Sequence, residues 1–163
     1  MAVKIKIPCY EYIRHFFIFR YPDGIYLSKY DEQSYWVRSL LSKPPFVSEY
    51  RQEKFTSHVF IYGPEKWFDN RLTYISNRNI RRFNDKFHQL FCDDLCAFIN
   101  MHRGEKKIME AAFLYMQKIG MTEDKYQIEW LLKLYQRHRP HFLEKNEENL
   151  HLEDNEKIHV SFA

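Results

Sequence analysis

Glycine is scarce in this sequence, with only four among 163 residues. Neither GxGxxG nor GxxxxGK[ST] occurs, so the chain lacks the glycine-rich loops that commonly hold nucleotide phosphates. The eight histidines include no HExxH pattern, and the carboxylates form no ordered set of the kind that a metal-dependent nuclease requires. We therefore expect no enzymatic activity and no cofactor.

Cysteine is equally scarce. Three cysteines without paired spacing are typical of a reducing compartment, and they predict a cytoplasmic protein without a disulfide framework. Cys92 and Cys96 are one helical turn apart, and His88 and His102 are the nearest further ligands. Because four ligands on a single helix cannot surround a metal ion tetrahedrally, we interpret both thiols as core residues and predict no metal site.

Long hydrophobic runs are also missing. Residues 1–7 alternate lysine with apolar residues and have no apolar core, which argues against a signal peptide. The longest apolar cluster, at 16–19, is far shorter than the roughly 20 residues with which a helix crosses a bilayer. We expect no interaction with a membrane.

Aromatic residues and unevenly distributed charge are abundant instead. The chain contains 14 phenylalanines, 12 tyrosines and 3 tryptophans, so rings should build much of the core and some should reach the surface. Residues 144–163 carry six acids and two lysines, a net charge of −4, whereas residues 1–143 carry +7. A basic body with an acidic tail fits an anionic partner for which the tail competes, and it equally fits a tail that is merely solvated.

The first half of the chain is typical of a small sheet with short helices. Residues 3–7 alternate apolar side chains with lysine, which predicts a half-buried strand. Pro8 fits the first turn of a helix that we expect to run to about Phe19. The other elements expected here are strands at 25–28, 55–62 and 72–76, of which the last two form a wide hairpin, and a helix at 34–41 capped by Asp31.

The second half predicts three consecutive helices. The first should begin at the N-cap Asn77 and end near Gly104, because apolar residues recur at steps of three and four over this span. The second is expected at 106–119. Thr122 is the candidate N-cap of the third helix, which Pro140 is expected to close.

These elements together predict an α+β protein in which a small N-terminal sheet with short helices precedes a three-helix half. Helix, glycine-containing turn and helix is the outline of a helix-turn-helix, and Gly120 lies in the corresponding turn. The expected divisions are a small α/β subdomain at 1–76, a three-helix subdomain at 77–143 and an acidic tail at 144–163.

The acidic tail ends in an alternating apolar pattern formed by Ile158, Val160 and Phe162. Alternation of this kind favours a short terminal strand that docks on the sheet. The other interpretation is a linear motif on a flexible acidic tether, which would bind a protein partner. Termini are usually loose unless something ties them down.

Basic residues concentrate where the helical half begins. Between residues 71 and 86, five cations accompany a single acid, Asp85, and a cationic first turn opposes the helix dipole, which favours an anion there. Trp67 and Tyr74 are candidate stacking rings, since a single strand pairs its phosphates with cations while its bases stack. The last turns of the third helix are basic as well. The candidate nucleic-acid-binding residues are Arg71, Arg78, Arg81, Arg82, Lys86, Lys125, Lys133, Arg137 and Arg139.

The predicted function is therefore DNA binding without catalysis, in regulation or replication. A solvated helix face is the other interpretation of the basic residues, and cations at the end of the third helix also stabilise its dipole. The alternative function is a protein–protein interaction module, such as an adaptor, inhibitor or assembly subunit, because aromatic residues and arginine are enriched at interfaces.

Three segments of the chain together resemble a known group of proteins. They are Val3-Lys4-Ile5-Lys6-Ile7-Pro8, Tyr74-Ile75-Ser76-Asn77 and residues 128–139. These segments are similar to short uncharacterised proteins encoded by mobile elements and prophages of gut Bacteroidales. The resemblance extends over most of the chain up to Arg139. It implies a cytoplasmic, DNA-handling context in a mobile element and no known catalytic residues.

Overall fold

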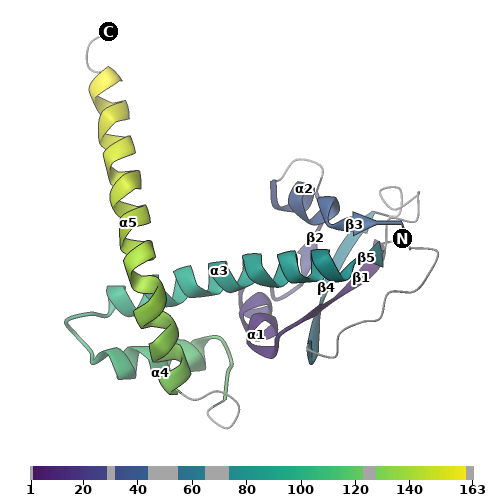
Figure 1. Cartoon of the computed structure of the whole chain (residues 1–163), viewed down its shortest axis with the longest axis horizontal. Coiled ribbons are helices and arrows are strands. Elements are labelled where there is room, and N and C mark those ends of the chain that lie inside the picture. The colour runs from purple at the N-terminus through teal and green to yellow at the C-terminus, as the bar shows by residue number, and fades with distance from the viewer. Residues whose placement is uncertain (1, 29–31, 44–54, 65–73, 123–127, 161–163) are drawn as a thin grey trace. The chain divides into compact units, whose positions relative to one another are not determined.

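The computed structural model describes residues 2–28, 32–43, 55–64, 74–122 and 128–160, with side chains up to residue 146 (Figure 1). A small mixed sheet and five helices in these ranges confirm the predicted α+β class. The elements are, in order, β1 (Ala2–Cys9), α1 (Glu11–Arg20), β2 (Ile25–Tyr26), α2 (Glu32–Ser39), β3 (Leu41–Ser42), β4 (Ser57–Pro64), β5 (Tyr74–Ile75), α3 (Asn77–Met101), α4 (Ile108–Lys118) and α5 (Ile128–Val160).

The chain divides into two compact units. Unit 1 comprises Met1–Phe91 with Lys118–Met121, and unit 2 comprises Cys92–Gln117 with Thr122–Ala163. The division falls within α3, so the first part of this helix belongs to the unit that contains the sheets. The expected boundary at residue 77 lies inside unit 1, and the subdomains 1–76 and 77–143 stay a prediction.

The sheet of unit 1 has the strand order β1-β4-β2. Strands β1 and β4 are antiparallel over their whole lengths, and β2 joins the other side of β4 in parallel. Ile5 and Ile7 of β1 and Val59 and Ile61 of β4 are buried, whereas their sequence neighbours are exposed or half-buried. One face of the sheet is therefore turned to the core, as the alternation at residues 3–7 predicted.

The core of unit 1 is built largely from rings. Helices α1 and the first part of α3 cover the buried face of the sheet (Figure 1). Phe17 of α1 lies 5.3 Å from Phe87 of α3 between ring centroids, and Phe83 and Phe87 lie 4.5 Å apart. The apolar stripe predicted for α3 is confirmed, since these members of it are buried: Ile80, Phe83, Phe87, Phe91, Leu95 and Ile99.

Two predictions about the strands are wrong. The described part of the expected 72–76 strand, β5, pairs with β3 and not with β4, so the wide hairpin does not form. An apolar pattern specifies which face of a strand is buried but not which strand it pairs with. Pro8 lies in β1 and does not begin a helix. A proline is tolerated there because β1 is an edge strand of its sheet.

The ends of the helices also differ from expectation at two points. Ser76, and not Asn77, caps α3, since its Oγ accepts a hydrogen bond from the backbone N–H of Asn79 at 3.3 Å. Pro140 does not close the last helix, because α5 continues to Val160. Proline removes only one hydrogen bond of the helix, and the turns that follow supply further contacts. One of these is the hydrogen bond of 2.8 Å from Asn146 Nδ2 to the carbonyl of Phe142.

The terminal strand is a further wrong prediction. Ile158 and Val160 belong to α5, and the helix includes most of the predicted 144–163 tail. Two alternating apolar residues within a long helical segment are too short a pattern to specify a strand. Phe162, the third member of the predicted pattern, lies outside the described residues, as does the expected cap Asp31.

Unit 2 joins the second part of α3 to α4 and α5 through polar contacts of tyrosines. The hydroxyl of Tyr115 on α4 donates to Oδ2 of Asp94 at 2.9 Å. The hydroxyl of Tyr135 on α5 donates to Oδ1 of Asn100 at 2.8 Å. Both tyrosines are buried, so each satisfies its polar tip on α3 while its ring packs in the core.

Candidate nucleic-acid interface

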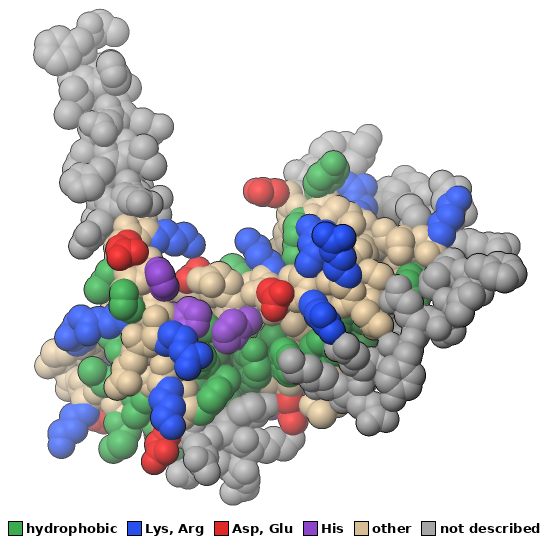
Figure 2. All heavy atoms as spheres, in the orientation of Figure 1, with side chains coloured by type: hydrophobic (Ala, Val, Ile, Leu, Met, Phe, Trp, Pro, Cys, Tyr) green, Lys and Arg blue, Asp and Glu red, His purple; other side chains and the backbone are tan. Residues whose placement is uncertain are grey.

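Four of the predicted cations lie together on one side of α3. Their spacing of three and four residues places them opposite the buried side of the helix, and all four are exposed. Figure 2 shows Lys and Arg side chains gathered over this part of α3. The first turn of the helix carries no acid. We call this surface the α3 basic ridge, and its members are Arg78, Arg81, Arg82 and Lys86.

Aromatic side chains line hollows on both sides of the α3 basic ridge. A hollow of about 310 Å³ lies beside Lys86 and is lined by Trp36 and Tyr21. Another, of about 340 Å³, lies beside Arg81 and is lined by Tyr10 and by Phe55. Cations and half-buried rings thus alternate across this surface of unit 1.

The second basic and aromatic surface is the face of the β1-β4-β2 sheet that points away from the core. Residues paired across antiparallel strands project to the same face, and the register places Lys4 opposite Tyr62 and Lys6 opposite Phe60. Tyr26 of β2 is in register with Tyr62. We call this surface the outer sheet face, and its members are Lys4, Lys6, Tyr26, His58, Phe60 and Tyr62.

Specific ring contacts organise the outer sheet face. The rings of Tyr26 and Tyr62 stack with centroids 5.1 Å apart and an interplanar angle of 19°. The Nζ of Lys4 lies 3.6 Å from the centroid of Phe60, in the position of a cation–π contact. His58 meets Phe60 edge-on at 4.9 Å. The face is therefore an ordered row of rings with lysine above it.

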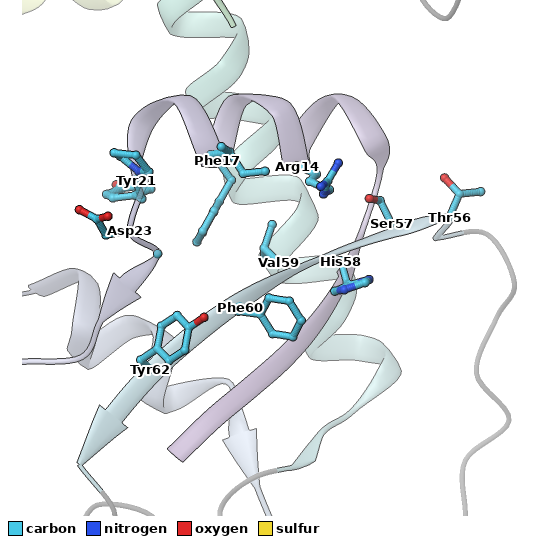
Figure 3. A pocket seen from close by; sticks show the side chains of 13 residues that line it. Arg14, Phe17, Tyr21, Asp23, Thr56, Ser57, His58, Val59, Phe60 and Tyr62 are labelled. Atoms are coloured by element: carbon cyan, nitrogen blue, oxygen red, sulfur yellow. The ribbon is translucent and has the colours of Figure 1, made fainter. Parts of the chain in front are cut away.

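A hollow of about 360 Å³ lies between α1 and β4 and reaches the edge of the outer sheet face. Figure 3 shows Arg14 on the α1 side and Val59 pointing towards α1, whereas Phe60 and Tyr62 project from the other side of β4. Asp23 also lines this hollow. Positive and negative groups therefore both border this part of the sheet.

His58 at this edge of the sheet is affected by burial and by three cations. The pKa of His58 lies below its usual value of 6.5, first because burial disfavours its charged form and then because Lys6, Arg14 and Lys4 repel a further proton. His58 is thus predominantly neutral at pH 7. Lys4, Lys6 and Arg14 are then the groups near His58 that can attract an anionic ligand.

The three cysteines are free and buried, and this burial confirms the interpretation of Cys92 and Cys96 as core residues. Burial raises the pKa of Cys9 to about 12 and that of Cys92 to about 12. It also raises the pKa of Cys96 to about 11. Because the thiolate is the reactive form, these thiols are poor nucleophiles in the folded protein.

The other predicted site residues lie on other elements or outside the described residues. Tyr74 is half-buried on β5. Lys133 and Arg137 are exposed on α5 of unit 2, and Arg139 is half-buried there. Arg71, Trp67 and Lys125 lie outside the described residues, as does the connection 123–127, so the helix-turn-helix stays a prediction.

The outer sheet face was not predicted from the sequence. Its local signal was present, because lysines alternate in β1 and rings alternate in β4. Each pattern predicted only a half-buried strand. That the two exposed rows lie side by side follows from the pairing of β1 with β4, which neither segment specifies alone.

Neither the apolar character of the described helices nor similarity to known proteins assigns a function to this chain. Over the described part of the chain, no helix combines the length and apolar character needed to cross a membrane. No protein-family model, curated protein or solved structure matches this chain.

Proposed function

We propose that this protein binds nucleic acid through the α3 basic ridge, without catalysis. The ligand proposed is DNA, in the regulation or replication of a mobile element in the cytoplasm. The observation that carries the proposal is the exposure of all four ridge cations on the side of α3 opposite Ile80, Phe83 and Phe87. Their positions depend on a buried helix face, so the ridge is presented on a rigid element.

Electrostatics favours an anionic ligand here. Each peptide dipole of α3 adds positive potential at the start of the helix, and the ridge adds four like charges to the same turns. Like charges one turn apart destabilise a helix by a few tenths of a kcal/mol per pair. Asp85 is the one acid within the ridge sequence and offsets only part of this charge. Phosphates of a nucleic acid would neutralise the remainder.

The rings beside the ridge favour a nucleic acid over a simple anion. Trp36 and Tyr21 line the hollow beside Lys86, and Tyr10 and Phe55 line the hollow beside Arg81, with one acid, Glu32 or Asp85, in each hollow. Alternating cations and aromatic side chains are the arrangement that nucleic-acid-binding surfaces use.

The test is the binding of labelled single-stranded and double-stranded DNA of one sequence, followed by fluorescence anisotropy between about 50 and 200 mM salt. We expect affinity to fall steeply with salt, because each phosphate that pairs with a cation releases counterions. The double variant Arg78→Ala/Arg82→Ala should weaken both ligands. It should also reduce the salt slope for duplex by about 0.9 for each lost phosphate contact.

A matched control removes the same charge elsewhere. Arg103 and Lys107 are exposed in unit 2, so Arg103→Ala/Lys107→Ala changes the net charge equally without touching the ridge. It should leave affinity nearly unchanged. Absence of binding, a flat salt response or equal losses in the two double variants would each refute the proposed site.

The second candidate function, a protein–protein interaction module, has its own supporting observation. Met101, Ile108 and Met109 are exposed apolar residues at the α3–α4 connection of unit 2. Exposed apolar patches can mark protein interfaces. Binding of a protein partner to this patch should persist at high salt. Met109→Glu should abolish that binding, whereas Arg78→Ala/Arg82→Ala should retain it.

A further inference from the structure

The outer sheet face has a composition that folding alone does not require. The opposite face of the same strands supplies the core, so the exposed positions are free to be polar. Instead Tyr26 is 62% exposed and stacks on the half-buried Tyr62, and Lys4 lies over the half-buried ring of Phe60. The exposed ring of Tyr26 can meet a planar ligand, and the rings of Tyr62 and Phe60 follow it on the same face.

The charged side chains of the outer sheet face are lysines, and Asp23 lines the hollow at its edge. Within the described strands β1, β2 and β4 there is no aspartate or glutamate. Lys4 and Lys6 are exposed, and the pKa of His58 is lowered first by burial and then by Lys6, Arg14 and Lys4. Charge complementarity therefore selects an anionic occupant.

We infer that the outer sheet face is a stacking platform for the unpaired bases of single-stranded nucleic acid. Bases would stack on Tyr26, Phe60 and Tyr62, and Lys4 would leave the ring of Phe60 to pair, like Lys6, with the phosphates between them. This inference rests on the proposed function and deepens it. It specifies single-stranded nucleic acid as the ligand of the sheet face, whereas the α3 basic ridge does not distinguish single strand from duplex.

A duplex is a poor occupant of this surface. Its base faces are already stacked inside the helix, so exposed rings can meet them only after the bases are unpaired. Lysines alone would bind duplex and single strand alike through phosphates. An acidic peptide would satisfy the lysines, but it offers no series of planar faces to match the rings. The combination of rings and lysines is what favours the single strand.

The test compares anisotropy titrations of wild type and variants with the same labelled DNA as a single strand and as a duplex. Tyr26→Ala/Phe60→Ala should lower single-strand affinity at least about tenfold, since each stacked base contributes substantially when its ring is removed. Duplex affinity, which depends on the ridge, should change less than about twofold. Thermal unfolding monitored by circular dichroism checks that the variant is folded.

Two further variants serve as controls. Tyr35→Ala removes a tyrosine that is 71% exposed on α2, outside the outer sheet face, and should leave both affinities unchanged. Tyr26→Phe keeps the ring and should retain single-strand binding. If the double variant does not fold, Tyr26→Ala alone removes an exposed side chain, and we expect a single-strand loss of about fivefold or more.

The outcomes separate the two proposals. One outcome is that Tyr26→Ala/Phe60→Ala leaves single-strand affinity unchanged while Arg78→Ala/Arg82→Ala loses both ligands. This outcome would refute the stacking platform and support the α3 basic ridge as the binding site. Equal losses of single strand and duplex in the Tyr26→Ala/Phe60→Ala variant would also overturn the platform. Failure of the wild type to bind either DNA would overturn the proposed function, and the platform with it.

Discussion

Asn84 on α3 and Tyr10, which precedes α1, are joined by a hydrogen bond of 3.1 Å from the backbone N–H of Tyr10 to Asn84 Oδ1. The Nδ2 of Asn84 donates to the carbonyls of Pro8 at 3.0 Å and Ile80 at 2.8 Å. Asn84 is 2% exposed. One buried amide thus holds the end of β1 to the helix that carries the basic ridge.

Asn84→Ala should destabilise the protein by about 2–4 kcal/mol, because it removes the three hydrogen bonds that a buried side chain makes to part-buried and buried backbone groups. Urea unfolding measures the change in the free energy of unfolding. Asn146→Ala removes an exposed amide that bonds only one backbone carbonyl, and it should cost less than about 0.5 kcal/mol. Equal effects of the two substitutions would show that the buried amide contributes little.

Gly24→Ala should destabilise unit 1 and disturb the outer sheet face. Gly24 has a φ of +82°, and a Cβ there would lie 2.8 Å from Cε2 of Tyr62. The positive φ alone costs about 1–2 kcal/mol for alanine. The clash must also move Tyr62 from its stack with Tyr26.

Gly104→Ala is the matched control for this prediction, because Gly104 has a φ of +111° and open space where a Cβ would lie. It isolates the cost of the backbone conformation. Both variants should unfold at lower urea than wild type, and only Gly24→Ala should also weaken single-strand binding. If neither variant alters that binding, the position of Tyr62 is not important for it.

Single-strand binding should strengthen as pH falls through the region below 6.5. The pKa of free His58 is depressed by burial and by Lys6, Arg14 and Lys4, and phosphates bound to these cations would raise it. Binding then takes up a proton, so the complex is favoured at lower pH. Folding has the opposite sign: the unfolded chain protonates His58 near 6.5 before the folded chain does, so the contribution of His58 to stability falls as pH falls.

His58→Gln should flatten the pH dependence of single-strand affinity, as measured by anisotropy on either side of pH 6.5. His102→Gln, in unit 2, removes a histidine from the other unit and should leave the dependence intact. A pH profile identical in wild type and His58→Gln would place the phosphates away from this edge of the sheet.

Removal of residues 147–163 should tighten DNA binding at low salt. The segment carries five acids and one lysine, so its loss raises the net charge from +3 to +7. The truncation retains Lys145, whose Nζ lies 3.2 Å from Oδ2 of Asp93. The gain should shrink as salt rises, because screening weakens the repulsion between the tail and DNA.

Replacement of those five acids by their amides in the full-length chain should reproduce the gain if charge is the cause. A truncated protein that binds DNA no more tightly than wild type at low salt would show that the tail does not compete for the basic surface. Anisotropy with duplex DNA is sufficient for both measurements.

Local patterns predicted much of the fold correctly. The alternation at residues 3–7 identified β1 and its buried face, and steps of three and four identified the buried stripe of α3. These patterns follow from the two-residue period of a strand and the 3.6-residue period of a helix. Both periods are local, so they can be recognised within a short segment. For the same reason, the spacing of Arg78, Arg81, Arg82 and Lys86 already placed them on one side of a helix.

The amino-acid sequence by itself therefore determined the buried faces of β1 and α3 and which cations share a helix face, whereas Tyr35, expected to point inward on α2, is exposed. Only the tertiary structure decided that β1 pairs with β4, that β5 pairs with β3, and that Tyr26 lies beside Tyr62. The physical reason is that side-chain periodicity is local, whereas strand pairing joins residues far apart in the chain and depends on the whole core. Lys4 and Phe60 become neighbours only through that pairing.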